Sequence, residues 1–329
     1  ELELIIIDEI SMVRADIIDA VDRILRVYSR NLREPFGGKQ LLLVGDVFQL
    51  EPVVKGDERE ILNRFYPTPY FFSARVFNQI DLVSIELEKV YRQTDKVFVS
   101  VLDHIRSNTA GAADLQLLNT RYGTDIEENE EDITLATRRD NVDYINDRKL
   151  AELPGDAVTF RGEVTGDFPE SSLPTSRELV LKPGAQVIFI KNDFDRRWVN
   201  GTIGVVSGFD EIEETLYVIT DDGKECDVKP EHWKNIRYKY NEKKKEIEEE
   251  VLGTFSQFPV RLAWAITVHK SQGLTFSRVV IDFTGGVFAG GQAYVALSRC
   301  TSLEGIQLKK PVNRADIFVR PEIVNFAER

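Results

Sequence analysis

The run Leu4-Ile5-Ile6-Ile7, which leads directly into Asp8 and Glu9, constrains the fold more than any other stretch of the chain. An unbroken apolar run of this length predicts a strand buried on both faces, as in the centre of a parallel sheet. Ligands of such sheets bind beyond the carboxyl ends of the strands, where Asp8 and Glu9 would lie. Two adjacent carboxylates there indicate either solvated acids or a site for a divalent ion and a phosphate.

A second strand with a polar end favours the site. The apolar run Leu41-Leu42-Leu43-Val44 is followed by Gly45-Asp46 and then by Gln49. Between the two runs, residues 12–28 carry apolar side chains at helical spacing. Two buried strands joined by a helix predict a βαβ unit in a parallel α/β sheet, so both polar ends should meet at one edge.

The rest of the chain changes from an α/β pattern to a β-rich one and back. Strands are expected at residues 82–87, 133–137, 262–266 and 279–283, and helices at residues 98–106, 137–150 and 292–299. From residue 179, short alternating strands with turn signals at Asn200-Gly201 and Asp221-Asp222-Gly223 predict a small barrel of about 75 residues. Residues 241–246 suit an exposed hairpin tip, with a charged helix as the alternative. The barrel is therefore expected to be inserted in the second of two α/β domains.

The composition limits the classes of protein. A length of 329 residues with 42% hydrophobic residues allows two or three domains with sizeable cores. Cys226 and Cys300 are the only cysteines and the histidines are dispersed, which predicts no disulfide framework, no zinc site and a reducing cytoplasm of the bacterial type. No apolar run approaches the ~20 residues of a membrane span. The net charge of -13 argues against broad, nonspecific nucleic-acid binding but permits a narrow basic track.

Five short motifs occur in a fixed order along the chain. They are Ile7-Asp8-Glu9-Ile10-Ser11-Met12-Val13, Gly45-Asp46-Val47-Phe48-Gln49-Leu50, Val90-Tyr91-Arg92-Gln93, Ala263-Trp264-Ala265-Ile266-Thr267-Val268-His269-Lys270-Ser271-Gln272-Gly273 and Tyr294-Val295-Ala296-Leu297-Ser298-Arg299. Each string alone is a weak signal. Together they resemble motifs II to VI of superfamily 1 helicases, above all the PIF (petite integration frequency) helicases and their RecD-like relatives. The resemblance covers nearly the whole chain.

The resemblance implies an α/β fold of two RecA-like (P-loop NTPase) parallel-sheet domains, the first of them incomplete. Residues 1–85 would form part of the first motor domain, and residues 86–178 and 258–329 the two halves of the second. Residues 179–257 would form an inserted barrel similar to a Src-homology-3 (SH3) domain. No Gly-x-x-x-x-Gly-Lys-Ser/Thr loop occurs, and Gly37-Gly38-Lys39-Gln40 has the wrong spacing. We therefore expect the phosphate-binding loop to precede Glu1, and this chain alone neither to bind ATP tightly nor to hydrolyse it.

The resemblance also implies roles for residues of a nucleotide site. Asp8 matches the acid that holds Mg²⁺, Glu9 the acid that activates water, and Gln49 the glutamine that senses the γ-phosphate of ATP. Arg92 and Arg299 match two arginines that reach this phosphate, whose developing charge a guanidinium spreads over several donors. The alternative for each arginine is a surface ion pair. Gly273 would let the backbone come close to the nucleotide or to DNA, or is a simple turn glycine.

Further residues match contacts to nucleic acid. Thr267, His269, Lys270 and Ser271 lie on one polar turn and match residues beside a single strand, where hydroxyls and an ammonium hold phosphates without reading bases. Thr137 matches a phosphate contact at a helix N-terminus, with an ordinary N-cap as the alternative. Aromatic residues of the barrel, Trp233, Tyr238 and Tyr240, suit barrel packing better than base stacking. Glu51 departs from the family pattern, which usually has proline there.

The function implied by the resemblance is an ATP-dependent DNA helicase that moves 5′ to 3′ along single strands. ATP and Mg²⁺ would be its cofactors, single-stranded DNA and forked duplex its partners, and a monomer its state, with no membrane association. Two alternatives stay open: a non-catalytic nucleic-acid-binding fragment, and an RNA-directed relative of the same superfamily.

Overall fold

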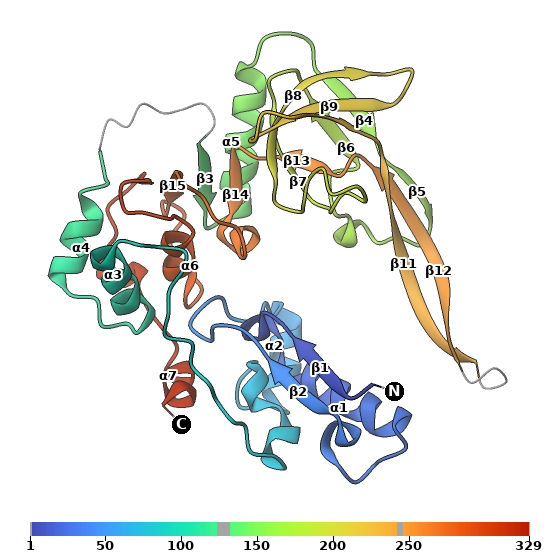
Figure 1. Ribbon diagram of the computed structural model, residues 1–329, viewed down its shortest axis with the longest axis vertical. Coiled ribbons are helices and arrows are strands. Elements are labelled where there is room, and N and C mark those ends of the chain that lie inside the picture. The colour runs from blue at the N-terminus through green and yellow to red at the C-terminus, as the bar shows by residue number, and fades with distance from the viewer. Residues whose placement is uncertain (1, 124–131, 242–245, 329) are drawn as a thin grey trace. The chain divides into compact units, whose positions relative to one another are not determined.

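The computed structural model describes residues 2–123, 132–241 and 246–328 (Figure 1). The chain divides into two compact units. Unit 1 contains residues 2–123, 135–137 and 267–328, and unit 2 contains residues 132–134, 138–241 and 246–266 of the described chain. The division passes through two strands, β3 (Ile133–Ala136) and β14 (Ala265–Thr267). No helix among the described residues is long and apolar enough to cross a membrane.

Unit 1 begins with the predicted parallel pair of strands. Strand β1 (Leu4–Ile7) pairs in parallel with β2 (Gln40–Leu43), and the helix α1 (Ala15–Tyr28) connects them (Figure 1). One face of the pair, with Ile7, Leu41 and Leu43, packs on a core that includes α1. The other face is not buried, because Leu4 is 43% and Ile6 60% exposed. The prediction of a strand buried on both faces is therefore wrong for this chain.

The C-terminal helix completes this first core. Helix α7 (Pro321–Ala327) brings the Phe326 ring over Phe72, with ring centres 4.4 Å apart and planes 9° from parallel. Phe326 also meets Phe71 edge-on at 5.5 Å. Residues from the two ends of the sequence thus share one aromatic cluster, with offset and edge-to-face pairs that each add about 0.5–1.5 kcal/mol to area burial.

The segment that follows this core is not a strand. We expected one at residues 82–87, but they form no regular structure. Val83, Ile85 and Leu87 are each more than 80% exposed, at 88%, 83% and 89%. The alternation of apolar side chains is typical of a strand, but no strand of the described chain pairs with this segment. The short helices α2 (Gly56–Asn63) and α4 (Ala112–Asn119), which the sequence did not indicate to us, lie on either side of this segment in the sequence.

A four-stranded sheet has the order β14-β3-β15-β16. Strand β15 (Val279–Asp282) pairs in parallel with β16 (Ile306–Leu308), and all four residues of β15 are buried. Helices α3 (Lys96–Arg106) and α6 (Gln292–Ser298) pack on each other in unit 1. The strands predicted at 133–137 and 279–283 and the helices predicted at 98–106 and 292–299 are confirmed to within about two residues, a normal boundary error. The strand predicted at 262–266 is instead split into two short ones.

Unit 2 is β-rich. It holds helix α5 (Arg139–Glu152) and the strands β4 (Val158–Arg161), β5 (Glu163–Gly166), β6 (Glu178–Leu181), β7 (Gln186–Phe189), β8 (Ile203–Asp210), β9 (Thr215–Thr220), β10 (Glu225–Val228), β11 (Glu231–Asn241), β12 (Glu246–Gln257) and β13 (Val260–Leu262). Its sheets have the orders β10-β9-β8-β7-β13, β11-β12-β5 and β4-β6. Phe189 stacks on Trp198 at 4.5 Å inside the core that β7 to β10 enclose.

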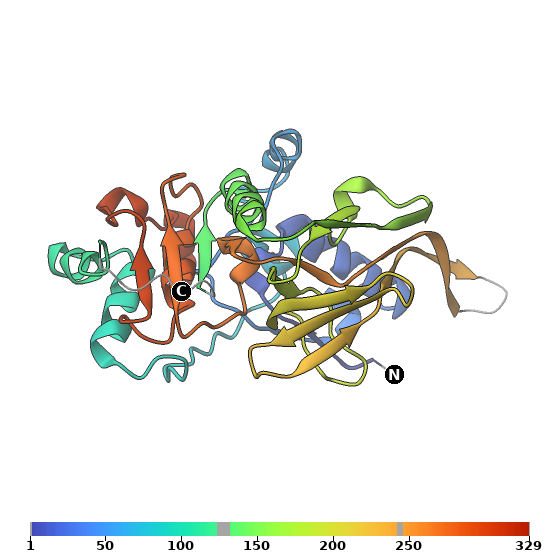
Figure 2. The same cartoon turned by 90° about the horizontal axis from the view of Figure 1, so that it is seen from above.

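The strands β11 and β12, coloured gold and orange in Figure 2, form a long antiparallel pair on either side of residues 242–245 in the sequence. Residues 242–245, most of the predicted tip, lie outside the described residues, as do the side chains of Tyr238 and Tyr240. Strands β4 and β5 escaped prediction because prolines, glycines and serines are interspersed through residues 155–177. The similarity of this unit to an SH3 domain and the four domain limits remain predictions.

A buried amide fixes the start of the polar turn. Asn146 of α5 donates through Nδ2 to the carbonyl of Ala265 (3.0 Å) and accepts through Oδ1 from the amide of Ala265 (2.9 Å). Both residues are buried, so each of these groups would otherwise lack a partner. This pair of bonds anchors β14, which leads into Thr267.

We predict that Asn146→Ala lowers the free energy of unfolding of unit 2 by about 1–3 kcal/mol, because two buried main-chain groups lose their partners. Asp147→Ala, an exposed change on the same helix, should stay within about 0.5 kcal/mol of the parent chain. Urea unfolding followed by circular dichroism measures both. Equal stability of the two variants would contradict the anchoring role of Asn146.

Candidate functional site

The ends of β1 and β2 form a tight polar corner. Glu9 has the left-handed backbone angles φ 50° and ψ 42°, and its amide donates to Asp8 Oδ1 at 2.8 Å. The next amide, of Ile10, bonds the carbonyl of Val44 at 3.0 Å, and a Cβ on Gly45 would come within 2.9 Å of that amide nitrogen. The left-handed conformation of Glu9 costs of order 1–3 kcal/mol for a residue other than glycine, and such residues concentrate at functional sites. The corner therefore aims Glu9 away from the direction of its strand.

A glutamine outside our predicted site joins Glu9 to Gln49. Gln272 donates through Nε2 to Glu9 Oε2 at 2.8 Å and to Gln49 Oε1 at 3.3 Å. The three residues come from three separate segments of unit 1. The only sequence signal was the position of Gln272 inside the fourth motif, between Ser271 and Gly273. The structure thus brings together the two predicted residues, Glu9 and Gln49, through a third.

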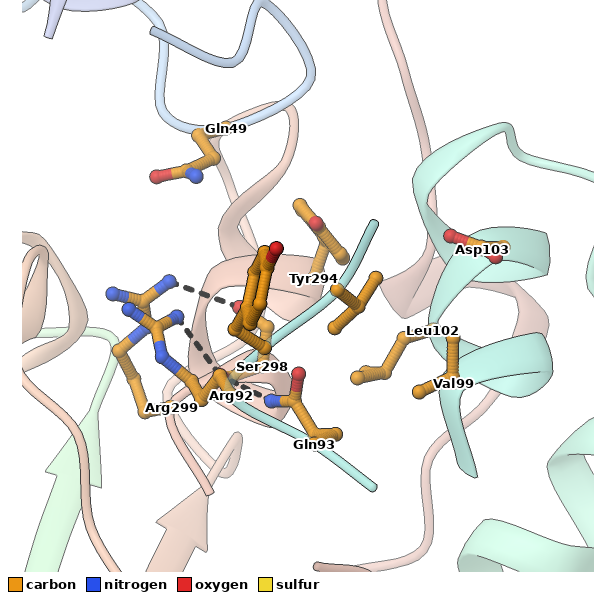
Figure 3. Close-up of a pocket in the computed structure, with 11 residues that line it drawn as sticks. Gln49, Arg92, Gln93, Val99, Leu102, Asp103, Tyr294, Ser298 and Arg299 are labelled. Carbon is orange, nitrogen blue, oxygen red and sulfur yellow. Dashed lines mark hydrogen bonds between the residues drawn. The ribbon is translucent and has the colours of Figure 1, made fainter. Parts of the chain in front are cut away.

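The two predicted arginines lie at the end of α6 (Figure 3). Arg299 is 1% exposed and donates to the carbonyls of Val295 (3.0 Å) and Leu274 (3.4 Å) and to the hydroxyl of Ser298 (3.1 Å). Arg92 donates to the carbonyl of Ser298 at 3.3 Å. Burial, followed by the positive charge of Arg92, lowers the pKa of Arg299 to about 10. Arg299 therefore stays charged at neutral pH but carries an electrostatic cost.

A buried amide ties these arginines together. Gln93 donates through Nε2 to the carbonyls of Ser298 (3.0 Å) and Cys300 (2.8 Å), the residues on either side of Arg299. The segment that carries Arg92 is therefore bonded to the backbone around Arg299 (Figure 3). Gln93 was also absent from our predicted site, although it follows Arg92 in the third motif.

An ion pair holds the loop that carries Gln49. Arg106 of α3 donates to Asp46 Oδ1 at 3.3 Å, and its guanidinium lies over the Phe48 ring, 4.7 Å from the ring centre. The pKa of Tyr294 on α6 is raised, first by burial and then by the charge of Asp46. The contacts of Arg106 with Asp46 and Phe48 therefore join the loop that carries Gln49 to α3.

A cavity of about 170 Å³ lies between these groups. Its lining includes Gln49, Arg92, Tyr294 and Arg299 (Figure 3). Sites that enclose whole small molecules measure about 300–1,000 Å³, so this cavity suits one group of a larger ligand. Two guanidinium groups in its wall favour an anionic group such as a phosphate.

The predicted nucleic-acid residues lie on a 3-10 turn, residues Val268–Ser271. Thr267 Oγ1 accepts from the amide of Lys270 at 3.3 Å, and Lys270 itself is exposed. The hydroxyl of Ser271 is buried and donates to the carbonyl of Val268 at 2.8 Å. Ser271 therefore holds the turn from inside, rather than facing a ligand as we expected. Gly273, at φ 81°, has open space around it.

Thr137 lies two residues before α5 and is not its cap. The N-cap position is Arg138, so the interpretation of Thr137 as a simple cap is wrong. Thr137 is 3% exposed, and its hydroxyl has no hydrogen-bond partner among the described residues. A buried hydroxyl without a partner costs about 1–3 kcal/mol, so packing alone does not explain a threonine here.

Asp8 is the single metal-ligand candidate of the sequence, and it is exposed at the corner beside Glu9. The part of the chain that the structure describes contains no group of three His, Cys, Asp or Glu residues suited to a metal ion. A lone carboxylate nevertheless fits Mg²⁺, which protein sites commonly hold with one or two carboxylates, waters and the phosphates of a substrate.

Glu51, which departs from the family pattern, is well anchored. Its Oε2 accepts from the hydroxyl of Tyr70 at 2.7 Å and from Nε of Arg320 at 3.4 Å. Glu51 also acts on His269, whose ring stacks on Phe288 at 6.2 Å. Burial lowers the pKa of His269 below its ordinary 6.5, while the negative charge of Glu51 opposes this shift.

We predict that His269 titrates below pH 6.5 and that Glu51→Gln lowers its pKa further, because the amide keeps the hydrogen bonds but removes the charge. Since the folded pKa is below the unfolded one, His269 contributes stability above pH 6.5 that is lost as the pH falls through the folded value. Proton NMR of the imidazole signals, assigned by single His→Gln variants, measures this. Glu304→Gln, an exposed change, serves as the control. A pKa at or above 6.5, or one unmoved by Glu51→Gln, would contradict the assignment.

Comparisons with known proteins agree with this arrangement. Residues 1–115 match a family model described as PIF1-like helicase. The ATP-dependent DNA helicase PIF1 of Homo sapiens is 36% identical over 317 residues, which cover 92% of this chain and 45% of the human protein. The ATP-dependent DNA helicase Pif1 of Bdellovibrio bacteriovorus is 31% identical, over 99% of this chain and 70% of that protein. The chain thus spans just under half the length of several relatives that it matches.

Solved structures extend the likeness to the fold. Bacteroides Pif1 bound to single-stranded DNA has a TM-score of 0.80 and 39% identity, over 99% of this chain and 75% of that one. Pif1 from Bacteroides in complex with ADP-AlF3 and single-stranded DNA also has a TM-score of 0.80 and 39% identity, over 100% of this chain and 75% of that one. The expected RecA-like α/β fold is thereby confirmed. On the identity and coverage of these relatives, the chain belongs to the PIF1-like helicase family.

Proposed function

We propose that these 329 residues form the greater part of the motor of an ATP-dependent DNA helicase. The observation that carries the proposal is that Gln49, which Gln272 joins to Glu9, lines the same cavity as Arg92 and Arg299. An acid, an amide and two guanidinium groups are what phosphoryl transfer to water needs: a group that orients the water and donors that stabilise the phosphate.

In this proposal each residue has one task. Glu9 accepts a proton from the attacking water, and Gln49 donates to the γ-phosphate. Arg92 and Arg299 stabilise the charge that develops on the transferred group. Asp8 would hold Mg²⁺ together with the phosphates, and the ion would supply charge neutralisation there. The sequence contains no phosphate-binding loop, so such a loop must be joined to these residues for turnover.

The nucleic-acid part of the proposal rests on the polar turn. Lys270 is exposed, and Thr267 and His269 are half-buried beside it. Together they supply donors for the backbone of a single strand. A solved structure shows Bacteroides Pif1 bound to single-stranded DNA, and another concerns DNA unwinding at forked double-stranded DNA by two coordinating Pif1 helicases, which supports the same partners here. Movement from 5′ to 3′, a monomeric state and a cytoplasmic location belong to the proposal as well.

A second candidate is a nucleic-acid-binding chain without motor activity, which would use only the polar turn with its exposed Lys270. The two candidates differ in what a supplied loop does. A motor gains DNA-stimulated turnover, whereas a binding chain does not.

The test is a steady-state ATPase assay on two polypeptides: the 329-residue chain, and the same chain joined to the phosphate-loop segment of Bacteroides Pif1. We predict no turnover from the first and DNA-stimulated turnover from the second. In the joined protein, Glu9→Gln and Arg299→Ala should each lower kcat by about 100-fold or more, because they remove the proton acceptor and a donor to the phosphate.

Glu304→Gln, an exposed change, should leave kcat unchanged. Full activity of Glu9→Gln, or robust turnover by the chain alone, would refute the assignment of the site. DNA binding without turnover in the joined protein would favour the second candidate. A parallel series with single-stranded RNA tests the RNA-directed alternative, which predicts stronger stimulation by RNA than by DNA.

A further inference from the structure

We infer that Gln272 is a positioning residue that aligns the carboxylate of Glu9 with the amide of Gln49, an inference that rests on the proposed function of that site. Its Nε2 is within hydrogen-bond distance of both, at 2.8 Å from Glu9 Oε2 and 3.3 Å from Gln49 Oε1. A primary amide has two N–H donors, so one side chain can serve two acceptors at once. Within the described part of the chain, the side chains of Glu9 and Gln49 make no other hydrogen bond.

Stability alone does not account for this side chain. The Oε1 of Gln272 is buried, and no described residue donates to it. A buried carbonyl oxygen without a donor costs about 1–3 kcal/mol, which offsets much of what the two donated bonds contribute. A side chain that buries an unpaired oxygen contributes little to the stability of the fold. Its presence points to a role in the chemistry of its neighbours.

The geometry explains why Glu9 needs such a partner. Its backbone is in the left-handed region, and Asp8 is its immediate neighbour in the chain. The charge of Asp8 and the freedom of an exposed corner would both let the Glu9 carboxylate turn away from Gln49. A donated hydrogen bond from a neutral amide fixes its orientation without neutralising its charge, so it remains able to accept a proton.

Gln272 also lies on the path between the turn and Arg299. It follows Lys270 and Ser271 directly, and two residues later the carbonyl of Leu274 accepts from Nη1 of Arg299 at 3.4 Å. One short segment therefore carries the exposed Lys270 at one end, contacts Glu9 and Gln49 in the middle and bonds Arg299 at the other end. Binding of single-stranded DNA to the turn can therefore change the position of Glu9, the proposed proton acceptor, through this one segment.

The experiment uses the joined protein described above, with Gln272→Ala and with Gln272→Glu, which keeps the shape but cannot donate when ionised. We expect the DNA-stimulated kcat to fall by about 10-fold or more in both, because positioned proton transfer contributes about 100- to 10,000-fold. KM for ATP and the affinity for single-stranded DNA should stay within about 3-fold, since neither ligand loses a direct contact. Gln307→Ala is the matched control, because Gln307 also has a buried, unpartnered Oε1 but lies on β16.

An unchanged kcat in Gln272→Ala would overturn the inference. A lower kcat together with a weaker KM for ATP and a lower melting temperature would also overturn it, because that combination indicates a merely structural role. A wild-type protein without turnover would instead overturn the proposed function. The contact itself is then tested in the 329-residue chain by a melting-temperature cycle of Gln272→Ala, Glu9→Ala and the double variant. Shifts that do not add support the contact, and strictly additive shifts overturn it.

Discussion

Two guanidinium groups, those of Arg92 and Arg299, are held close together without an ion-pair partner among the described residues, and this arrangement carries an electrostatic cost. Among the described residues, no ion pair includes Arg92 or Arg299, and Arg299 is fully buried. Removing a charge from water and placing it near a like charge is unfavourable. The chain offsets this cost with main-chain carbonyls around the C-terminal end of α6, where a positive charge is also favoured by the helix dipole. Gln93 donates to the carbonyls of Ser298 and Cys300 and so bonds the segment of Arg92 to the backbone on either side of Arg299.

The remaining parts of the site bring complementary groups to these arginines. The left-handed turn at Glu9, the Asp46–Arg106 ion pair and the amide of Gln272 each fix one side chain near the cavity. Two of these features cost stability: the left-handed backbone of Glu9 and the buried, unpartnered Oε1 of Gln272 within the described chain. This pattern is typical of a site in which the fold maintains strained or unpaired groups for a ligand.

The sequence was informative where a pattern depends on neighbours in the chain. Buried strands such as β15, the helix α6 and the polar ends of β1 and β2 follow from periodicity and from strand order, and the motifs located Glu9, Gln49 and Arg299. Periodicity shows which face of an element is apolar but not what covers it. For that reason the exposure of Ile6 and the irregular segment at residues 82–87 escaped prediction.

Contacts between distant segments were also beyond the sequence. Gln272 and Glu9 are 263 positions apart, and Gln93 and Ser298 are 205 apart. A glutamine has no distinctive spacing, so only the fold reveals that its amide meets a carboxylate or a carbonyl. The inward hydroxyl of Ser271 illustrates the converse, because a polar residue on a polar turn was expected to face a ligand and instead holds the turn.

The most direct test of the central claim is the stability of Arg92→Gln in low and high salt. If the arginines are held together against their repulsion, the variant should be more stable than the parent chain by about 0.5–1 kcal/mol in low salt, as for a like-charge pair near a surface. The gain in stability should shrink at high salt, because salt screens the repulsion between the two arginines in the parent chain. Arg33→Gln, which removes an exposed charge elsewhere in unit 1, should show no such gain. A variant less stable than the parent chain at every salt concentration would contradict the account.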